Sequence, residues 1–228
     1  MENRKKKYKE KKMNKENNKK AWILDIIIIL FSTIGTIWEI WENGWGMLHY
    51  YTVDSNIFIT ICCFLDIFWQ RSSQKKKERA IWIKNLKYMA TCCMMLTFFV
   101  VVFILAPIGG VTGLIQILTE RGLLFHHTLC PIAAIISYYR VDCKQFKLKK
   151  YMTYIGMVPT VFYAIVVLTL NIKKKIYGPY PFLYVYEQEL WVSVMWILVI
   201  LGLAYAIGWV LWKGCYLLQK NELECYYF

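Results

Sequence analysis

Six long apolar stretches dominate this sequence and leave little chain for anything else. They lie at residues 21–42, 51–70, 86–107, 122–139, 151–172 and 190–212. Each has about 20 residues, which at about 1.5 Å per residue is enough to cross a hydrocarbon core about 30 Å thick. Backbone N–H and C=O groups find no water inside lipid, so such stretches should be helices. We therefore predict an all-α membrane protein, a six-transmembrane-helix bundle within residues 21–213.

The aromatic residues agree with this prediction. Several of the ten tryptophans stand near the ends of the predicted spans: Trp22, Trp41, Trp45, Trp69, Trp191 and Trp212. An amphipathic indole ring at a span end suits the headgroup region of a bilayer. A transmembrane barrel would instead need segments of about ten residues with alternating hydrophobicity, and the sequence has no such alternation.

Charged residues between the spans predict the orientation. The opening "MENRKKKYKEKKMNKENNKK" holds ten Lys or Arg and no apolar run, so we expect residues 1–20 to be a disordered basic tail. Counted over the tails and connections, 23 Lys and Arg fall on the side of both termini and only four on the other side, while Lys87 lies just inside the third span. The positive-inside rule then places both termini, including a short C-terminal tail at residues 214–228, in the cytoplasm.

This distribution also bears on partners and location. The net charge of +13 is explained by orientation and by attraction to anionic lipids, so no nucleic-acid partner is expected. The lysine-rich composition without a cleavable signal peptide is typical of a multi-pass protein of a bacterial inner membrane. Asp25 and Asp66, near the cytoplasmic ends of their spans, should snorkel or meet the lysines of the linkers.

The eight cysteines give no sign of a metal centre. Five lie in predicted spans, Cys143, Cys215 and Cys225 lie on the predicted cytoplasmic side, and no CxxC motif occurs. Adjacent residues of a helix face about 100° apart, so neighbouring cysteines cannot bind one ion together. We expect reduced cysteines that serve packing, with no metal and no cofactor.

The second span begins with unusual polarity, in the sequence "YYTVDSNIF" from Tyr50. Thr52, Ser55 and Asn56 stand at positions i, i+3 and i+4 and therefore share one helix face. This face could line a binding site near the extracellular side. Alternatively, the three residues could hydrogen-bond to neighbouring helices, which contributes about 0.6 to 2 kcal/mol each in membrane proteins.

The fourth span carries two histidines at a similar depth. His126 and His127 follow its start by about five residues, which is roughly 7 to 9 Å along a helix. Ionisable groups at such depth usually face the bundle interior or a cavity. Pro131 removes a backbone donor just beyond the histidines and should bend or loosen the helix there. The alternative is a solvated pair, or a pair bonded to backbone carbonyls.

The connection before the last span, "KKKIYGPYPFLYVYEQE", predicts a stiff aromatic turn that could act as a lid. Glu39 near the outer end of the first span, Tyr51 beside Thr52 and Tyr180 in this turn are candidate substrate-binding residues together with Ser55 and Asn56. Polar groups from four segments of the chain are thus expected at one membrane depth.

Three of these motifs resemble a known family. "YYTVDSNIF", "HHTLCPI" and "YGPYPFL" are similar to the signatures of the androgen-induced-protein-like family of six-helix membrane proteins, and the likeness covers residues 21–212. Animal members hydrolyse fatty acid esters of hydroxy fatty acids with a threonine nucleophile and a histidine. The resemblance implies Thr52 as the nucleophile. The bacterial pattern, with a histidine four residues before a proline, selects His127 as the base, and the animal spacing of five selects His126.

The sequence departs from the family in two places. Its third motif reads Gly-Pro-Tyr-Pro where the family has Tyr-Pro-Tyr-Pro, and "DSN" differs from the animal continuation. The hypothesis that follows is a membrane-embedded threonine hydrolase of lipid esters. Ser55 or Asn56 would stabilise the oxyanion in this mechanism. The alternatives are a non-catalytic membrane protein that binds lipids or small molecules and, with no inverted repeat to support it, a transporter.

Overall fold

The computed structural model describes residues 2–72, 80–145 and 149–224, and no strand occurs within these ranges. The elements of the first half of the chain are α1 (Glu2–Asn43), η1 (Trp45–His49), α2 (Tyr51–Ser72), α3 (Ile81–Val100), η2 (Val101–Leu105) and α4 (Ala106–Thr119). Here η1 is a 3₁₀ turn and η2 is π-helical.

The second half begins with a nearly continuous helix that is interrupted twice by π-helical turns, η3 and η4. Its elements are α5 (Arg121–Leu124), η3 (Phe125–Leu129), α6 (Cys130–Ser137), η4 (Tyr138–Asp142) and α7 (Cys143–Gln145). The chain then forms α8 (Met152–Ile155), α9 (Val158–Ile172), the 3₁₀ turn η5 (Pro181–Leu183) and α10 (Leu190–Glu224).

Five helices in the described residues are long and apolar enough to cross a membrane. They are Asn18–Asn43, Tyr51–Ser72, Ile81–Leu105, Met152–Ile172 and Leu190–Asn221. These helices confirm five of the six predicted apolar spans. The remaining prediction, residues 122–139, lies within the interrupted helix that runs from α5 to α7.

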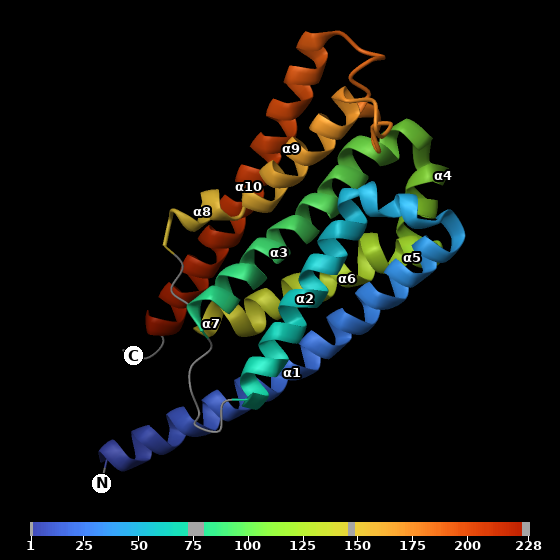
Figure 1. The fold of residues 1–228 in the computed structure, drawn as a ribbon. Helices are drawn as coiled ribbons and strands as arrows, with labels where there is room; N and C mark the ends of the chain where they lie inside the picture. The colour runs from blue at the N-terminus through green and yellow to red at the C-terminus, as the bar shows by residue number, and fades with distance from the viewer. Residues whose placement is uncertain (1, 73–79, 146–148, 225–228) are drawn as a thin grey trace.

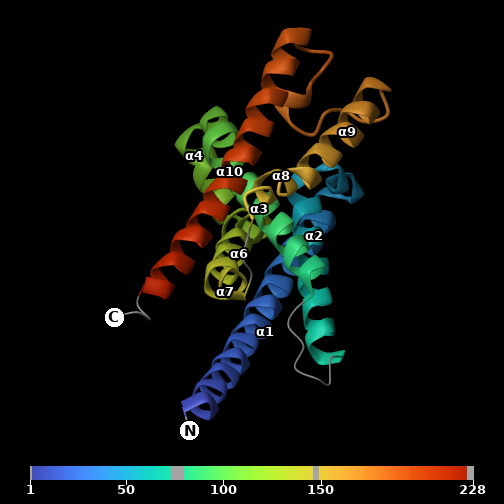
Figure 2. The same cartoon turned by 90° about the vertical axis from the view of Figure 1, so that its left-hand side faces the viewer.

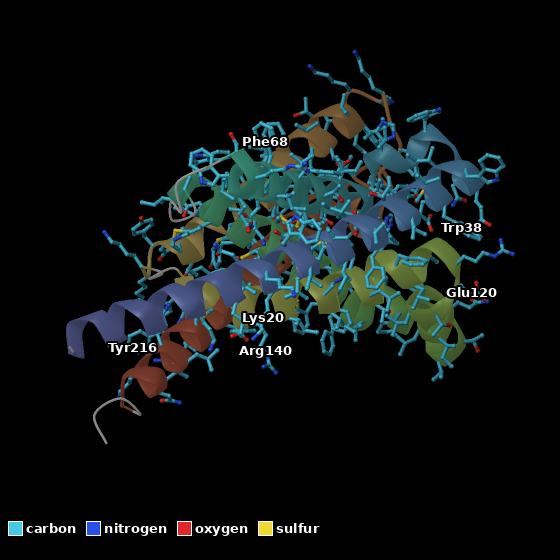
Figure 3. All side chains as sticks on the ribbon, turned by 90° about the horizontal axis from the view of Figure 1, so that it is seen from below. Lys20, Trp38, Phe68, Glu120, Arg140 and Tyr216 are labelled. Atoms are coloured by element: carbon cyan, nitrogen blue, oxygen red, sulfur yellow. A yellow bond between two sulfur atoms is a disulfide. The ribbon has the colours of Figure 1, made fainter. Side chains whose placement is uncertain are left out.

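The helices lie along one another as a bundle (Figures 1 and 2). The connections α1–α2, α4–α5 and α9–α10 are found at one end, which we name the loop end, and both termini are at the other, the terminal end. Large apolar side chains such as Trp38 and Phe68 are exposed on the outside of the bundle (Figure 3). A surface of this kind suits lipid rather than water.

Two parts of the chain are helical outside the limits of the predicted spans. Residues 2–20 form the first turns of α1, and the mobility of this basic tail stays a prediction. The segment between the third and fourth predicted spans lies outside the predicted helices. It folds as α4, which bends at Gly110, where φ is 66°, a backbone conformation that favours glycine. The charged linkers predicted near residues 71–84 and 140–150 fall partly outside the described residues, at 73–79 and 146–148.

A buried ionic cluster joins four segments toward the terminal end. The Lys87 ammonium of α3 lies 2.6 Å from Oδ1 of Asp25 in α1 and 3.3 Å from Oδ2 of Asp66 in α2. Asp142 of η4 follows at 3.6 Å. Lys87 and the carboxylates are all buried. The aspartates of the first two spans therefore meet Lys87, a lysine of the third span.

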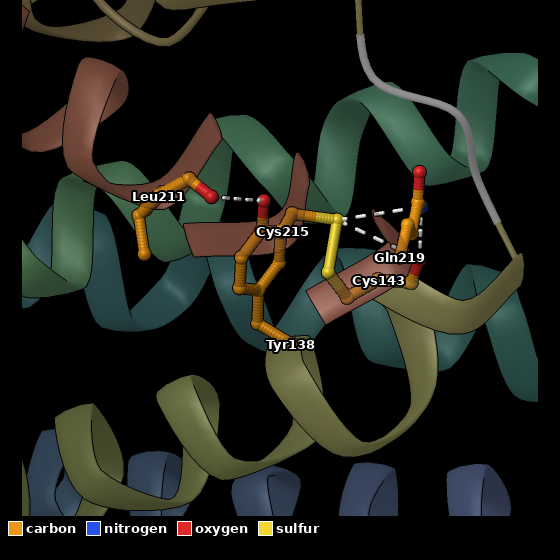
Figure 4. Close-up of a disulfide and its surroundings, with 5 residues drawn as sticks. All are labelled: Tyr138, Cys143, Leu211, Cys215 and Gln219. Carbon is orange, nitrogen blue, oxygen red and sulfur yellow. Dashed lines mark hydrogen bonds between the residues drawn. A yellow bond between two sulfur atoms is a disulfide. The ribbon is translucent and has the colours of Figure 1, made fainter. Parts of the chain in front are cut away.

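The cysteine prediction is wrong for one pair. Cys143 and Cys215 form a disulfide that joins α7 to α10, with Cα atoms 5.4 Å apart (Figure 4). Tyr138 supports the same contact by donating a hydrogen bond to the carbonyl of Leu211, 3.0 Å away. The two cysteines are 72 residues apart in sequence, so only the packing of α10 against α7 brings them together. The five cysteines of the spans are free and buried, and Cys225 lies outside the described residues.

The ionic cluster gives a first prediction. Replacing Lys87 with methionine leaves three buried carboxylates without their shared cation and should destabilise the protein by about 3 to 5 kcal/mol. The measurement is thermal unfolding in detergent, followed by the loss of helical circular dichroism. Lys213→Met is the matched control, because Lys213 makes no ion pair among the described residues. Equal melting temperatures for the two variants would contradict a structural role of the cluster.

Candidate functional site

A cavity of about 280 Å³ lies at the loop end and brings together the polar residues that the sequence singled out. Thr52, His126, His127, Glu39 and Tyr180 all line it. They come from α2, η3, α1 and the α9–α10 connection. These five residues, from four separate segments of the chain, therefore lie around one cavity.

The histidines sit on a widened turn. Their segment, η3, is π-helical, and its closing hydrogen bond runs from Cys130 N–H to the carbonyl of Phe125. Pro131 follows directly in α6 and has no N–H to donate. The predicted loosening of the helix beside Pro131 is thus observed as a π-helical turn, a feature often found at functional sites. Thr128 anchors this turn by donating a hydrogen bond to the Leu118 carbonyl of α4.

His126 is held firmly against α1. Its side chain is fully buried, and its Nε2 lies 3.1 Å from the hydroxyl of Thr36. Gly35 permits this approach, because a β-carbon there would lie 2.5 Å from Cδ2 of His126. Gly122 allows a similar approach on the histidine helix, where an added β-carbon would lie 2.6 Å from Oε1 of Glu39. Small residues at such crossings let membrane helices approach closely.

His127 has more freedom to engage a ligand. It is buried, with 6% of its surface exposed, and its Nδ1 makes no hydrogen bond within the described residues. A buried ring nitrogen without a partner is costly unless something else bonds to it. Of the two imidazoles that line the cavity, His127 is therefore the one less committed to the protein.

Thr52 stands in the first turn of α2 beside Tyr180. The Thr52 backbone N–H donates to the Tyr180 hydroxyl at 3.3 Å, and the two hydroxyl oxygens are 3.4 Å apart. The described residues show no hydrogen bond between the Thr52 hydroxyl and either imidazole. The structure thus places nucleophile and base candidates around one cavity without a direct bond between them.

Ser55 and Asn56 have structural partners instead. Both side chains donate to the Thr52 carbonyl, each at 2.9 Å, and Ser55 also lies 3.1 Å from the hydroxyl of Thr97 in α3. Ser32 of α1 donates to the Asn56 carbonyl at 2.6 Å. Neither Ser55 nor Asn56 is among the residues that line the cavity. Ser55 thus matches the alternative interpretation, because its side chain bonds to α3, whereas the side-chain hydrogen bond of Asn56 stays within α2.

Glu39 and Tyr51 differ in their relation to the cavity. Glu39 lines it and accepts a hydrogen bond from Nδ2 of Asn43 at 3.2 Å. Tyr51 points to α9, where its hydroxyl lies 2.8 Å from that of Thr160. It lines a second, largely apolar cleft of about 70 Å³, bounded mainly by α3, α9 and α10. Thr52 and Tyr180 line both spaces and so stand where the two meet.

The aromatic turn between α9 and α10 contributes side chains to the lining of the cavity. Tyr180 is flanked by Pro179 and Pro181, which line the cavity with it. Its ring stacks on Phe182 at 5.0 Å and meets Tyr50 edge-on at 5.5 Å. Burial raises the pKa of the Tyr180 phenol to about 12, so the hydroxyl keeps its proton at neutral pH. Tyr180 is therefore a fixed hydroxyl donor at the entrance to both spaces.

A metal centre is not indicated here. Within the described ranges, no group of three or more His, Cys, Asp or Glu side chains is arranged to hold an ion.

Comparisons with protein-family models, with curated proteins and with solved structures find no match for this chain. The functional argument therefore depends on the geometry of the cavity and on the three sequence motifs.

The close approach of α1 to His126 gives a second prediction. Gly35→Ala places a methyl group where Cδ2 of His126 and Cβ of Phe125 now lie, and should cost about 1 to 3 kcal/mol of stability. Gly202→Ala is the matched control, since a β-carbon at that position of α10 meets no atom within 4 Å. Thermal unfolding in detergent should show a lower melting temperature for Gly35→Ala only. A wild-type melting temperature for Gly35→Ala would mean that the helices do not meet this closely.

Proposed function

We propose that this chain is a member of the androgen-induced-protein-like family and hydrolyses lipid esters, with Thr52 as nucleophile and His127 as general base. One observation carries the proposal: Thr52, both imidazoles and Tyr180 line a single cavity in a protein with membrane-length helices. The three motifs that resemble the family supply these residues, which lie up to 128 positions apart in the sequence.

The proposed reaction uses an activated hydroxyl. His127 takes the proton of the Thr52 hydroxyl as its oxygen attacks the ester carbonyl carbon. The tetrahedral intermediate then expels the alcohol, which receives the proton from His127, and leaves an acyl-threonine. A water molecule, deprotonated by His127, attacks this second ester, and the carboxylic acid leaves as Thr52 regains its proton. Contacts between such a base and its nucleophile are often formed only once the substrate is bound.

Tyr180 is the better candidate for stabilising the oxyanion. Ser55 and Asn56 already donate to the Thr52 carbonyl and lie outside the cavity lining. The Tyr180 hydroxyl accepts from the Thr52 N–H and retains its own proton. It can therefore donate that proton, in a hydrogen bond, to an oxygen that develops negative charge next to the Thr52 hydroxyl.

The apolar cleft suits an aliphatic chain. It is bounded mainly by side chains of α3, α9 and α10 and opens beside Thr52 and Tyr180. An acyl chain lying in this cleft would hold its ester group at Thr52, with the polar part of the substrate in the histidine cavity. Burial of the chain would contribute about 0.8 kcal/mol per CH₂ group, which favours a lipid over a short, water-soluble ester.

The orientation belongs to the same proposal. With six spans and both termini in the cytoplasm, the loop end and its cavity face the outer half of a bacterial inner membrane. The asymmetry of Lys and Arg supports this arrangement. The Cys143–Cys215 disulfide would then lie near the cytoplasmic side, where disulfides are rare. Both cysteines are almost fully buried, which shields the bond from soluble thiols.

The enzymatic proposal gives a third prediction. Thr52→Ala should abolish both labelling by a fluorophosphonate probe and hydrolysis of a long-chain lipid ester, because the attacking oxygen is gone. His127→Ala should lower turnover by about 10²- to 10⁴-fold, and Tyr180→Phe, which keeps the stacked ring, by about 10²- to 10³-fold. The measurement is the rate of fatty acid release by the purified protein in detergent.

Thr60→Val is the matched control for Thr52→Ala. Thr60 lies two turns further along α2, outside the cavity lining, and its hydroxyl bonds to the Asn56 carbonyl. Unchanged hydrolysis by Thr52→Ala would exclude the mechanism proposed here. If the wild-type protein cleaves no ester but co-purifies with lipid, and Thr52→Ala and Tyr180→Phe reduce that lipid, the same cavity serves a non-catalytic binding protein.

The orientation gives a fourth prediction. In a bacterial host, green fluorescent protein fused after Phe228 should fluoresce, and alkaline phosphatase fused at the same place should be inactive, because the C-terminus stays in the cytoplasm. The phosphatase inserted after Gly46, in the α1–α2 connection, should be active. The opposite pattern at both positions would reverse the orientation and place the cavity in the inner half of the membrane.

A further inference from the structure

Three consecutive lysines at the loop end are not explained by the orientation of the chain. Lys173, Lys174 and Lys175 follow α9 and make up three of the four basic residues on the predicted outer side. The positive-inside rule disfavours such a run there. They do not line the cavity that holds Thr52. Lysines after a helix C-terminus do offset its dipole, so a role beyond capping needs separate observations.

A separate cavity lies beside these lysines. It measures about 300 Å³ and is bounded by the α9–α10 connection, which lies at the top of Figure 1. Its lining includes Asn171, Lys174, Lys175, Tyr184 and Glu187. None of its lining residues belongs to the histidine cavity. Lys173, the remaining lysine of the run, is not part of the lining.

The first observation that points to a ligand is a buried amide. Asn171 is only 3% exposed, and its Oδ1 has no hydrogen-bond partner within the described residues. A buried carbonyl oxygen of this kind costs stability unless a donor reaches it. Asn171 lines the cavity, so a bound molecule with a hydroxyl or ammonium group would supply the missing donor once the amide turns its oxygen toward the cavity.

The second observation is the backbone of Lys174. Its φ is 55°, and Lys174 N–H and Lys175 N–H bond to the carbonyls of Asn171 and Leu170 at 2.8 and 2.9 Å. This is the C-terminal helix cap in which glycine is the usual residue at the left-handed position. A lysine there is conformationally unfavourable, and glycine would close the helix at least as well. The cap by itself therefore does not explain a lysine at this position.

The charges around the cavity favour an anion. None of the three lysines forms an ion pair within the described residues, and the Lys174 ammonium lies 5.0 Å from the centre of the Tyr186 ring. The carboxylate of Glu187 accepts a hydrogen bond from the Tyr177 hydroxyl. Two lysines and one carboxylate that is already hydrogen-bonded leave the lining with net positive charge.

We propose that the cavity beside Lys174 and Lys175 binds a phosphate ester that also carries a hydroxyl or primary ammonium group, as the headgroups of common phospholipids do. Lys174 and Lys175 contact the phosphate, and Asn171 accepts from the hydroxyl or ammonium group. The position of the cavity in a loop between two membrane-length helices places it where lipid headgroups lie. This inference does not rest on the hydrolase proposal, because the cavity beside the lysines shares no residue with the cavity that holds Thr52 and only Val185 with the apolar cleft.

The test uses the full-length protein in dodecyl maltoside micelles, titrated with dioleoylphosphatidylglycerol and observed by native mass spectrometry. Lys174→Gln and Lys175→Gln should each weaken binding by about tenfold, as expected for the loss of one charged hydrogen bond. Lys173→Gln should bind as the wild type does, because its side chain lies outside the lining. Equal weakening by all three substitutions would show diffuse attraction and overturn the proposal.

Two further variants separate binding from folding. Lys174→Gly should have an unchanged or higher melting temperature and yet lose most of the lipid affinity. Asn171→Leu, which keeps the size of the side chain, should remove the preference for phosphatidylethanolamine over phosphatidylcholine, since both headgroups are zwitterionic and choline offers no donor. Wild-type binding by Lys174→Gly would refute the site, whatever the behaviour of Asn171→Leu.

The source of the phosphate is decided by competition. Inorganic phosphate at millimolar concentration is added to the protein with bound lipid. If it displaces lipid from the wild type, but does not displace the lipid that Lys175→Gln still binds, the cavity recognises the phosphate itself. If it displaces none while the lysine variants still weaken lipid binding, the cavity requires the whole headgroup. If phosphatidylglycerol and neutral dioleoylglycerol bind with equal affinity, the cavity recognises neither a phosphate nor a phosphate-containing headgroup, and the proposal is overturned.

Discussion

A lysine ammonium buried among three carboxylates determines which helices stand together in this protein. Lys87 of α3 holds Asp25 of α1, Asp66 of α2 and Asp142 of η4 within 3.6 Å. Charges are expensive to bury, and they persist only where opposite charges meet them in a defined geometry. The same helices continue to the loop end and carry Glu39, Thr52 and the two histidines. Because helices are stiff, an arrangement set by the ionic cluster is also set at the cavity.

At the loop end, the helices are positioned by close contact between their backbones rather than by buried charges. Gly35 and Gly122 let α1 and the histidine helix approach until Nε2 of His126 reaches the Thr36 hydroxyl. The π-helical turn before Pro131 then carries both imidazoles to the cavity. Both imidazoles have a buried Nδ1 without a partner among the described residues, but His126 also bonds to Thr36 through Nε2, and no hydrogen bond within the described residues holds the His127 ring. The two adjacent histidines thus differ in how many hydrogen bonds the protein makes to their rings, and this difference comes from helix packing.

Much of the fold was predictable, and the site only in part. Long apolar runs predicted five of the membrane-length helices, because in lipid the length and hydrophobicity of a segment nearly suffice to define it. Thr52, His126, His127 and Tyr180, which the motifs singled out, line one cavity, and their chemical roles stay predictions. Ser55 and Asn56 looked equally suitable, but their side chains bond to the Thr52 carbonyl. A polar residue on the right helix face can turn to backbone or to a cavity, and sequence spacing does not separate these cases.

By itself, the sequence determined the helical class and the places of five long apolar helices along the chain, since both follow from local composition. Only the tertiary structure decided which groups meet. The contact of Cys143 with Cys215, the cluster around Lys87 and the position of Tyr180 over Thr52 all join residues far apart in the chain. Such contacts depend on how helices pack side by side, and a helix of given composition can pack in many ways until glycines, buried charges and hydrogen bonds select one.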